Sequence, residues 1–261
     1  MVSAVGAAAL TGCGAKEADN KITVESASEA PETKPIEIET EAPETEAPET
    51  GAADPDEQEP RVEKDGMIRS YLTGEMVPVS QGNRRPLAIM MSNDKAALPQ
   101  YGINRAGVVY EAPVEATMNR YLAIMEDYDD LTRIGSVRSC RTYYVYFARE
   151  FDAIYAHFGQ STFAKPYLKF IDNINGIEGQ GSTAYFRSKD KKSPHNAYAS
   201  FEGIQRAIEK LGYSQEYDAD YDGHFRFAKE GTEAVMHGAD VREAYKVTPG
   251  YKLNNPWFEY H

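Results

Sequence analysis

The segment Gly135-Ser-Val-Arg-Ser-Cys-Arg141 carries the residue types best suited to binding an anion. It runs from a predicted strand into a predicted helix, and the start of a helix presents free N–H groups and a partial positive charge. Ser139 is a candidate to cap that helix, and Arg138 and Arg141, three residues apart, are expected to project toward one side. Arginine binds carboxylate or phosphate through paired hydrogen bonds. We therefore predict an anion site at Arg138, Ser139 and Arg141.

A structural role for the same arginines is the alternative. In that case they form ion pairs inside the fold with Glu111, Glu115 or Glu150. Glu111 and Glu115 are also candidate site residues, since two carboxylates can hydrolyse a glycan. However, residues four apart on one strand are separated by roughly 13 Å, which is too far for two carboxylates to flank one bond.

Two histidines at predicted strand ends and loops are candidates for a general base. His157 ends a predicted strand, and His195 and Asn196 lie in a loop that begins at Arg187, a further candidate for the anion site. Arg120 precedes another predicted strand and is also a candidate. Histidine titrates near neutrality, and loops at strand ends often carry function. We expect both histidines to border one cleft, with a structural role for each as the alternative.

Other chemistries lack their residue patterns. Cys140 falls on the apolar face of the predicted helix, which argues against a nucleophilic thiol. The spacings His-x-His, His-Glu-x-x-His and Cys-x-x-Cys are absent, so we expect no metal site. The stretch 218–223 has the aspartates of a calcium loop but lacks the distal glutamate, and we interpret it as an acidic loop, with sugar stacking on its tyrosines as the alternative.

Cofactor and nucleic-acid binding also lack support. The sequence has no Gly-x-Gly-x-x-Gly or Walker-type loop, so we expect no nucleotide cofactor, and no other cofactor is indicated. A basic stripe is missing, which argues against DNA or RNA as a partner.

The elements that must position these residues are predicted from apolar patterning. Strands are expected at 86–91, 107–114, 121–125, 152–158 and 183–186. Aromatic residues at helical spacing predict a helix over about 140–150, with Cys140 on the same stripe. A second helix is expected to begin after Ser200 as N-cap and to end at Gly212. Strands and helices without strict alternation indicate an α+β fold.

The amino terminus has the features of a lipoprotein signal. Residues 1–13 are apolar and small and end in Leu10-Thr-Gly-Cys13, which resembles the bacterial lipobox. The resemblance implies that Cys13 carries a diacylglycerol, and that two or more acyl chains then anchor the protein stably. No apolar stretch is long enough for a transmembrane helix. We therefore expect a lipid-anchored protein on the extracellular face of the cell membrane.

The acidic charge of the chain is concentrated in one segment. The whole chain has a net charge of −13. Residues 14–65 contain 17 Asp or Glu and 5 Lys or Arg, hence −12, and repeat Glu-Ala-Pro-Glu-Thr at 41–45 and 46–50. Such a composition cannot build a core. We predict a disordered acidic spacer at 14–65, a folded domain at 66–238, and the start of an incomplete carboxy-terminal module at 239–261.

Four motifs in order resemble one family. Arg85-Pro-Leu-Ala-Ile-Met90, Ala106-Gly-Val-Val-Tyr-Glu111, the 135–141 segment and Pro194-His-Asn196 are similar to the YerB-like lipoproteins of Gram-positive bacteria. The resemblance covers about 85–200 and implies a three-layer α+β sandwich followed by a smaller carboxy-terminal domain. It implies no activity. Cys140 departs from the family pattern, which usually has a small residue there, and Asn119 stands where Thr is common.

Three functions remain open from the sequence. The first is a non-catalytic surface module that binds an anionic cell-envelope ligand. The second is an envelope hydrolase or transferase with a histidine as general base. The third is a scaffold that docks another envelope protein.

Overall fold

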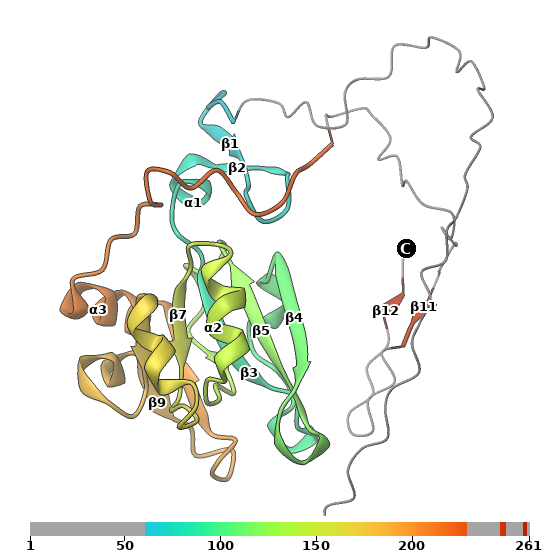
Figure 1. Cartoon of the computed structure of the whole chain (residues 1–261), viewed down its shortest axis with the longest axis vertical. Coiled ribbons are helices and arrows are strands. Elements are labelled where there is room, and N and C mark those ends of the chain that lie inside the picture. Colours follow the sequence, from blue (N-terminus) through green and yellow to red (C-terminus); the bar gives the residue numbers. More distant parts are fainter. Residues whose placement is uncertain (1–60, 229–245, 249–257, 260–261) are drawn as a thin grey trace, which may run out of the picture. The chain divides into compact units, whose positions relative to one another are not determined.

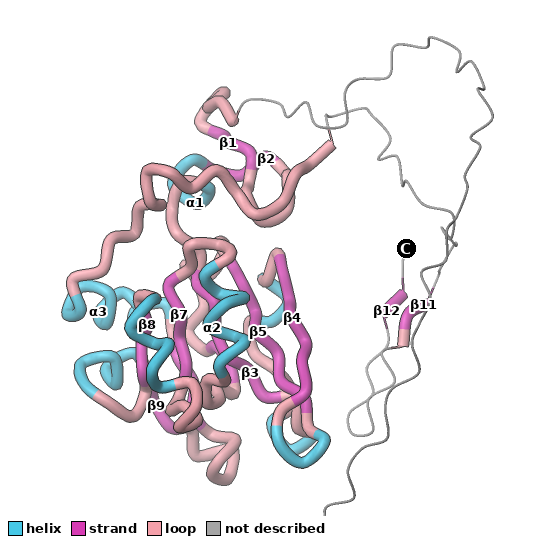
Figure 2. The backbone as a smooth tube through the Cα atoms, viewed as in Figure 1, coloured by secondary structure: helices cyan, strands magenta, loops and turns pink. Residues whose placement is uncertain are grey.

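In the computed structural model, which describes residues 61–228, 246–248 and 258–259, a five-stranded mixed sheet forms the centre of the fold (Figure 1). Its strands, in spatial order, are β4 (Val108–Pro113), β5 (Asn119–Met125), β3 (Leu87–Ser92), β7 (Ile154–His157) and β8 (Asn173–Asn175). β4, β5 and β3 are antiparallel neighbours, whereas β3, β7 and β8 run parallel. Figure 2 labels all five strands of this sheet. The carboxyl ends of β3, β7 and β8 therefore lie at the same end of the sheet as the amino end of β5.

Both faces of the sheet are covered, which explains the continuous apolar run of its central strand. Every residue of β3 is buried. Leu87, Ile89 and Met91 belong to the apolar cluster on one face, and Ala88 and Met90 belong to the cluster on the other. A strand buried on both faces needs apolar side chains at consecutive positions and not only at alternate ones.

Helix α2 (Thr142–Arg149) covers one face of the sheet. Its residues Tyr144, Val145 and Ala148 are buried. Phe147 stacks on Tyr110 of β4, with ring centroids 4.5 Å apart. The buried Cys140 also belongs to this cluster, but it precedes the helix and is not on its apolar stripe as predicted.

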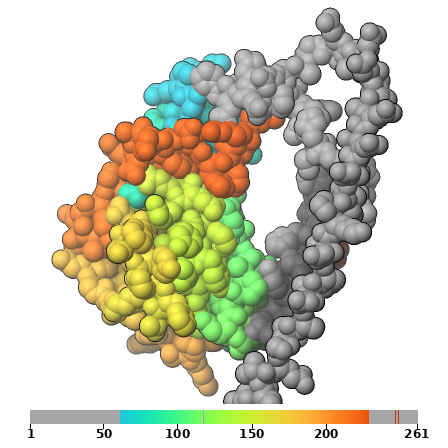
Figure 3. All heavy atoms as spheres, viewed as in Figure 1, coloured from blue at the N-terminus to red at the C-terminus, as the bar shows by residue number. Residues whose placement is uncertain are grey.

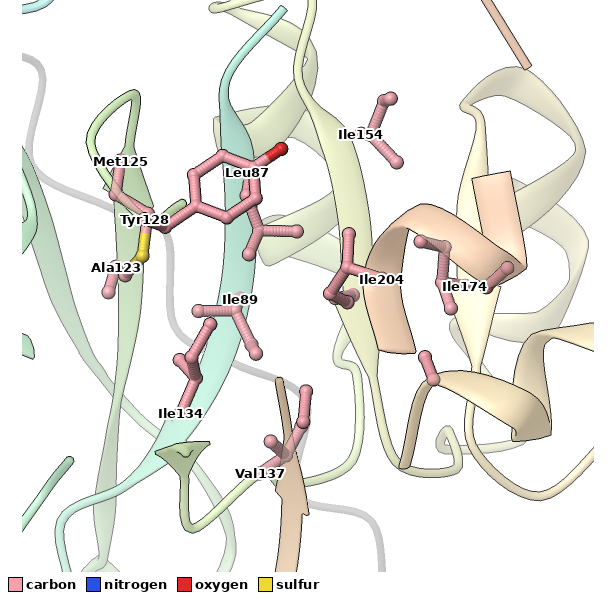
Figure 4. Close-up of a cluster of buried hydrophobic side chains, with 14 of the residues drawn as sticks. Leu87, Ile89, Ala123, Met125, Tyr128, Ile134, Val137, Ile154, Ile174 and Ile204 are labelled. Carbon is pink, nitrogen blue, oxygen red and sulfur yellow. The ribbon is translucent and has the colours of Figure 1, made fainter. Parts of the chain in front are cut away.

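Helix α3 (Phe201–Leu211) covers the opposite face together with a small sheet of β6 (Ile134–Gly135), β10 (Ala197–Ala199) and β9 (Tyr185–Arg187). Figure 4 shows Ile204 of α3 in the cluster that contains Leu87 and Ile89. The helix ends are as predicted: the Ser200 side chain accepts a hydrogen bond from the Gly203 N–H, and Gly212 adopts a left-handed conformation with φ of 72°. Helix, sheet and helix make the three layers implied by the family resemblance.

The remaining described elements lie outside the central layers. The hairpin β1 (Met67–Arg69) and β2 (Met76–Pro78) is followed by the short helix α1 (Val79–Gly82). Residues 213–228 pass beside this hairpin (Figure 3). The Tyr71 ring contacts the rings of Tyr217 and Tyr221. β11 (Lys246–Val247) pairs with β12 (Phe258–Glu259). Short 3₁₀ segments occur at Lys95–Ala97, Ile103–Arg105, Glu115–Thr117, Lys165–Phe170 and Gly179–Ala184.

Four of the predicted strands are found with shifted ends, and the fifth is found only in part. Of 183–186, only Tyr185 and Phe186 are in a strand, because Gly179–Ala184 form a 3₁₀ segment that packs against α3. The predicted signal segment 1–13 with Cys13, residues 14–60 of the predicted spacer 14–65, and most of 239–261 lie outside the described residues. Within the described residues, no helix has the length and apolar composition needed to cross a bilayer.

Candidate functional site

A cavity of about 240 Å³ lies at the end of the sheet where β3 ends and β5 begins. Three residues follow or end β3, three surround the start of β5, and the others come from two loops. The lining residues are Ser92, Asn93, Asp94, Met118, Asn119, Arg120, Arg138, Pro194 and His195. We call this the arginine cavity, because Arg120 and Arg138 are its basic residues.

The segment 136–140 positions Arg138 by inserting between the ends of two parallel strands. The Arg138 N–H donates to the Met90 carbonyl of β3, and the Arg138 carbonyl accepts from the Phe158 N–H after β7, both at 3.0 Å. Gly135 directly precedes this segment with φ of +131°, and a Cβ there would lie 2.7 Å from the Val137 nitrogen. A glycine is therefore required where the chain turns into the gap.

Arg120 is buried but forms no ion pair with a carboxylate of the described residues. Its side chain lies on β5, the residue is 6% exposed, and its Nη1 donates to the Ser139 carbonyl. Within the described part of the chain, no salt bridge reaches Arg120. Burial, and after it the nearby charges of Arg141 and Arg138, lower the pKa of Arg120 to about 10, while the charge of Glu115 opposes the shift. The site therefore holds a buried positive charge that forms no direct ion pair with a described carboxylate.

Arg141, in contrast, is neutralised within the fold. Its Nε and Nη2 donate to the two carboxylate oxygens of Glu115 at 2.5 and 2.6 Å. This pairing holds the pKa of Glu115 near 2. Glu115 lies in a 3₁₀ segment after β4, not on the strand with Glu111. For Arg141, the alternative of a structural ion pair matches the geometry.

The other predicted anion-site residues do not join Arg120 and Arg138 in the cavity lining. The Ser139 hydroxyl donates to the Phe158 carbonyl at 3.0 Å, so the prediction that it caps the helix is wrong. Arg141 occupies the N-cap position without a side-chain cap. Arg187 is exposed on β9, where its Nη1 donates to Asn196 Oδ1 at 2.6 Å. Arg138 lies in the lining, and its Nη1 donates to the Pro194 carbonyl at 2.9 Å.

The Glu111 carboxyl group is hydrogen-bonded to two residues that line the cavity. Its Oε1 accepts hydrogen bonds from the side-chain amides of Asn93, at 2.8 Å, and Asn119. Burial raises the pKa of Glu111 to about 7, although the Asn93 amide opposes the shift. This carboxyl therefore titrates near neutrality and contacts two amides that face the cavity.

The expectation that both histidines border one cleft needs correction. His157 is fully buried, with Nδ1 2.8 Å from the Gly159 carbonyl and Nε2 3.2 Å from Asn173 Oδ1. Burial lowers its pKa. With both ring nitrogens in contacts inside the fold, His157 has the environment of a structural residue. His195 does line the arginine cavity, whereas Asn196 is bonded to Arg187 and does not.

Several lining residues escaped the sequence analysis, above all Asn93, Asp94 and Asn119. Their signal was position: Asn93 and Asp94 directly follow β3, which is buried along its whole length, and ligands often bind beyond the carboxyl ends of such strands. The described residues contain no group of three or more His, Cys, Asp or Glu arranged to hold a metal ion.

Comparisons with known proteins support the fold and leave the chemistry open. A family model described as "Protein of unknown function (DUF3048) N-terminal domain" matches residues 72–214. The Bacillus subtilis (strain 168) protein named "Putative lipoprotein YerB" is 33% identical over 193 residues, which cover 72% of this chain and 54% of that protein. The crystal structure of YerB from Bacillus subtilis is similar with a TM-score of 0.53 and 34% identity, covering 57% of this chain and 52% of that chain. The chain thus spans about half the length of the curated relative it matches.

Proposed function

This chain belongs to the DUF3048 family of proteins of unknown function, and we propose that it is a lipid-anchored cell-surface protein whose folded domain binds an anionic group in the arginine cavity. Arg120 is the observation that carries the binding proposal. A buried charge without a counter-ion is costly, and proteins keep such charges where a ligand or a reaction uses them. Arg120 keeps its charge buried beside Arg138, while Glu115 is engaged by Arg141.

The ligand class follows from the donors and from the size of the cavity. Guanidinium groups bind carboxylate or phosphate, and a cavity of about 240 Å³ is smaller than most small-molecule pockets, which begin at about 300 Å³. The site therefore suits one anionic group of a larger envelope molecule. Asn119 Oδ1 and His195 Nδ1 are buried and have no hydrogen-bond partner among the described residues. An anion that also carries a hydroxyl or N–H donor would engage the Asn119 oxygen.

The anchor is proposed from the amino-terminal sequence and from the name of the relative. Leu10-Thr-Gly-Cys13 matches the pattern of a lipobox, and the related Bacillus protein is named as a lipoprotein. Lipid on Cys13, followed by the acidic segment 14–65, would hold the domain at a distance from the membrane. Expression of Cys13→Ala in a Gram-positive host tests this part: the variant should leave the membrane fraction, and its retention there would contradict the anchor.

Calorimetric titration tests the binding part. The probes are inorganic phosphate, glycerol phosphate and acetate, each titrated into the full chain. We expect saturable binding of at least one probe. Arg138→Ala should weaken that binding by at least about tenfold, which is the loss of one charged hydrogen bond.

Arg206→Ala is the matched control, because Arg206 is exposed on α3 and pairs only loosely with Glu202 at 3.9 Å. It should bind as the parent does. If no probe binds, or if Arg138→Ala and Arg206→Ala bind equally well, the proposed site is wrong.

A further inference from the structure

A second cavity, with a volume of about 530 Å³, lies at the opposite end of the sheet. It is found where β3, β7 and β8 begin, between the end of α2, the 3₁₀ segment Lys165–Phe170 and the loop after α3. The lining residues are Arg85, Arg149, Asp152, Ala153, Lys169, Phe170, Ile171, Asp172, Asp218, Asp220 and Tyr221. We call this the mixed-charge cavity, since side chains of both signs line it.

Part of this charge is neutralised within the fold. Arg85 forms salt bridges with Asp152 at 3.2 Å and with Asp172 at 2.7 Å. Its Nε also donates to the Asp152 carbonyl, and its Nη1 donates to the Ser214 carbonyl. Arg85 and these two aspartates therefore form a rigid clamp that holds the loop after α3 against the strand ends.

The clamp also holds Asp152 in an unfavourable backbone conformation. Asp152 has φ of 47°, in the left-handed region that most residues avoid. Its Oδ2 accepts a hydrogen bond from the Asp218 N–H at 2.8 Å. The loop that carries Asp218 and Asp220 is thus fixed on one rim of the cavity, which reduces the entropy lost when a ligand binds.

Four charged side chains of the lining remain outside this clamp. Arg149 and Lys169 come from the end of α2 and from the 3₁₀ segment, and Asp218 and Asp220 come from the loop. Among the described residues, none of the four takes part in a salt bridge, so the two basic and two acidic groups do not neutralise one another directly. These four side chains have a net charge of zero, and the clamp of one arginine and two aspartates brings the whole lining to −1.

This arrangement is complementary to a molecule that carries both charges. The volume lies within the range of about 300–1,000 Å³ that is typical of small-molecule sites. Phe170 is 54% exposed and Tyr221 is half-buried, so the cavity also offers aromatic surface. We infer that the mixed-charge cavity binds a short peptide with free ends, its carboxylate at Arg149 and Lys169 and its ammonium group at Asp218 and Asp220.

The test compares three peptides that differ only in their end charges. Trialanine, N-acetylated trialanine and trialanine amide are titrated into the full chain and followed by calorimetry. We expect trialanine to bind saturably. Removal of either end charge should weaken binding by at least about tenfold, equal to about 1.4 kcal/mol.

Paired variants assign each end of the peptide. Asp218→Asn with Asp220→Asn should weaken trialanine binding but leave the affinity for the N-acetylated peptide unchanged. Arg149→Gln with Lys169→Gln should leave the affinity for the amide unchanged. Asp222→Asn and Lys165→Gln are matched controls outside the cavity lining and should behave as the parent. The absence of saturable trialanine binding, or equal binding of all three peptides, would overturn the inference.

Discussion

One arginine is buried at each end of the central sheet to the same degree, but the two arginines have opposite electrostatic surroundings. Arg85 and Arg120 are both 6% exposed. Arg85 is paired with two aspartates and with backbone carbonyls, whereas Arg120 donates to one carbonyl and faces two other arginines. Equal burial therefore does not imply an equal role. The paired Arg85 joins segments of the chain, whereas Arg120 is the residue for which we propose a ligand.

Removal of the paired arginine should have the largest effect on stability. Arg85→Met leaves Asp152 and Asp172 without their cation and breaks the tie to Ser214. We expect a loss of about 3–5 kcal/mol in the free energy of unfolding, as for other buried pairs that lose one partner. Urea denaturation at neutral pH measures this. A loss below about 1 kcal/mol would show that the clamp is not structural.

Glu111, which is hydrogen-bonded to residues that line the arginine cavity, should make the free energy of unfolding depend on pH. Its folded pKa of about 7 lies above the usual unfolded value of about 4.3, so the folded state holds more protons between these values. The contribution to stability is therefore full below about pH 4.3 and is lost as the pH rises through 7.

Glu111→Gln removes this titration and provides the measurement. Relative to the parent, the variant should gain stability as the pH rises from about 4 to 8, by an amount on the order of 1–3 kcal/mol. Urea denaturation at several pH values follows this difference. A constant difference across that range would contradict the raised pKa.

The smallest expected effect on stability is that of Glu115, which pairs with Arg141. Its folded pKa of about 2 lies below the unfolded value, so its contribution is present above about pH 4.3 and is lost as the pH falls toward 2. The carboxylate side chain is 59% exposed, and solvent screening limits the pair to less than about 1 kcal/mol. Thermal unfolding of Glu115→Gln should show this small loss at pH 7 and none near pH 2. A loss that is the same at both pH values would argue against the ion pair.

The sequence predicted the elements that depend on local pattern. Strands were expected in the regions of β3, β4, β5 and β7 and, in part, β9, whereas β8 of the central sheet was not predicted. Both longer helices were expected, and α3 has the predicted Ser200 and Gly212 at its ends. The assignment of Ser139 as a cap was wrong, because its hydroxyl donates to Phe158, a residue 19 positions away. The insertion of 136–140 between β3 and β7 is likewise a long-range pairing that no local pattern encodes.

The candidate site was predicted in part for the same reason. The sequence singled out Arg138, Arg120 and His195, which the fold brings to one cavity. It also grouped His157 with them, because both histidines follow or border strands. The side chain of His157 instead points into the fold, since alternation along β7 and the contact with Asn173 place it there. The sequence position of a residue predicts that it lies at the end of a strand, but it does not predict the direction of the side chain.

The most direct measurement of the central claim is the stability of Arg120→Met with and without phosphate. Without phosphate, the variant should unfold within about 1 kcal/mol of the parent or above it, because loss of one hydrogen bond is offset by removal of an unneutralised buried charge. With phosphate at 100 times its dissociation constant, the parent should gain about 2.7 kcal/mol and the variant should gain little. A variant that loses several kcal/mol without phosphate, together with a parent that phosphate does not stabilise, would show that Arg120 is a structural residue like Arg85.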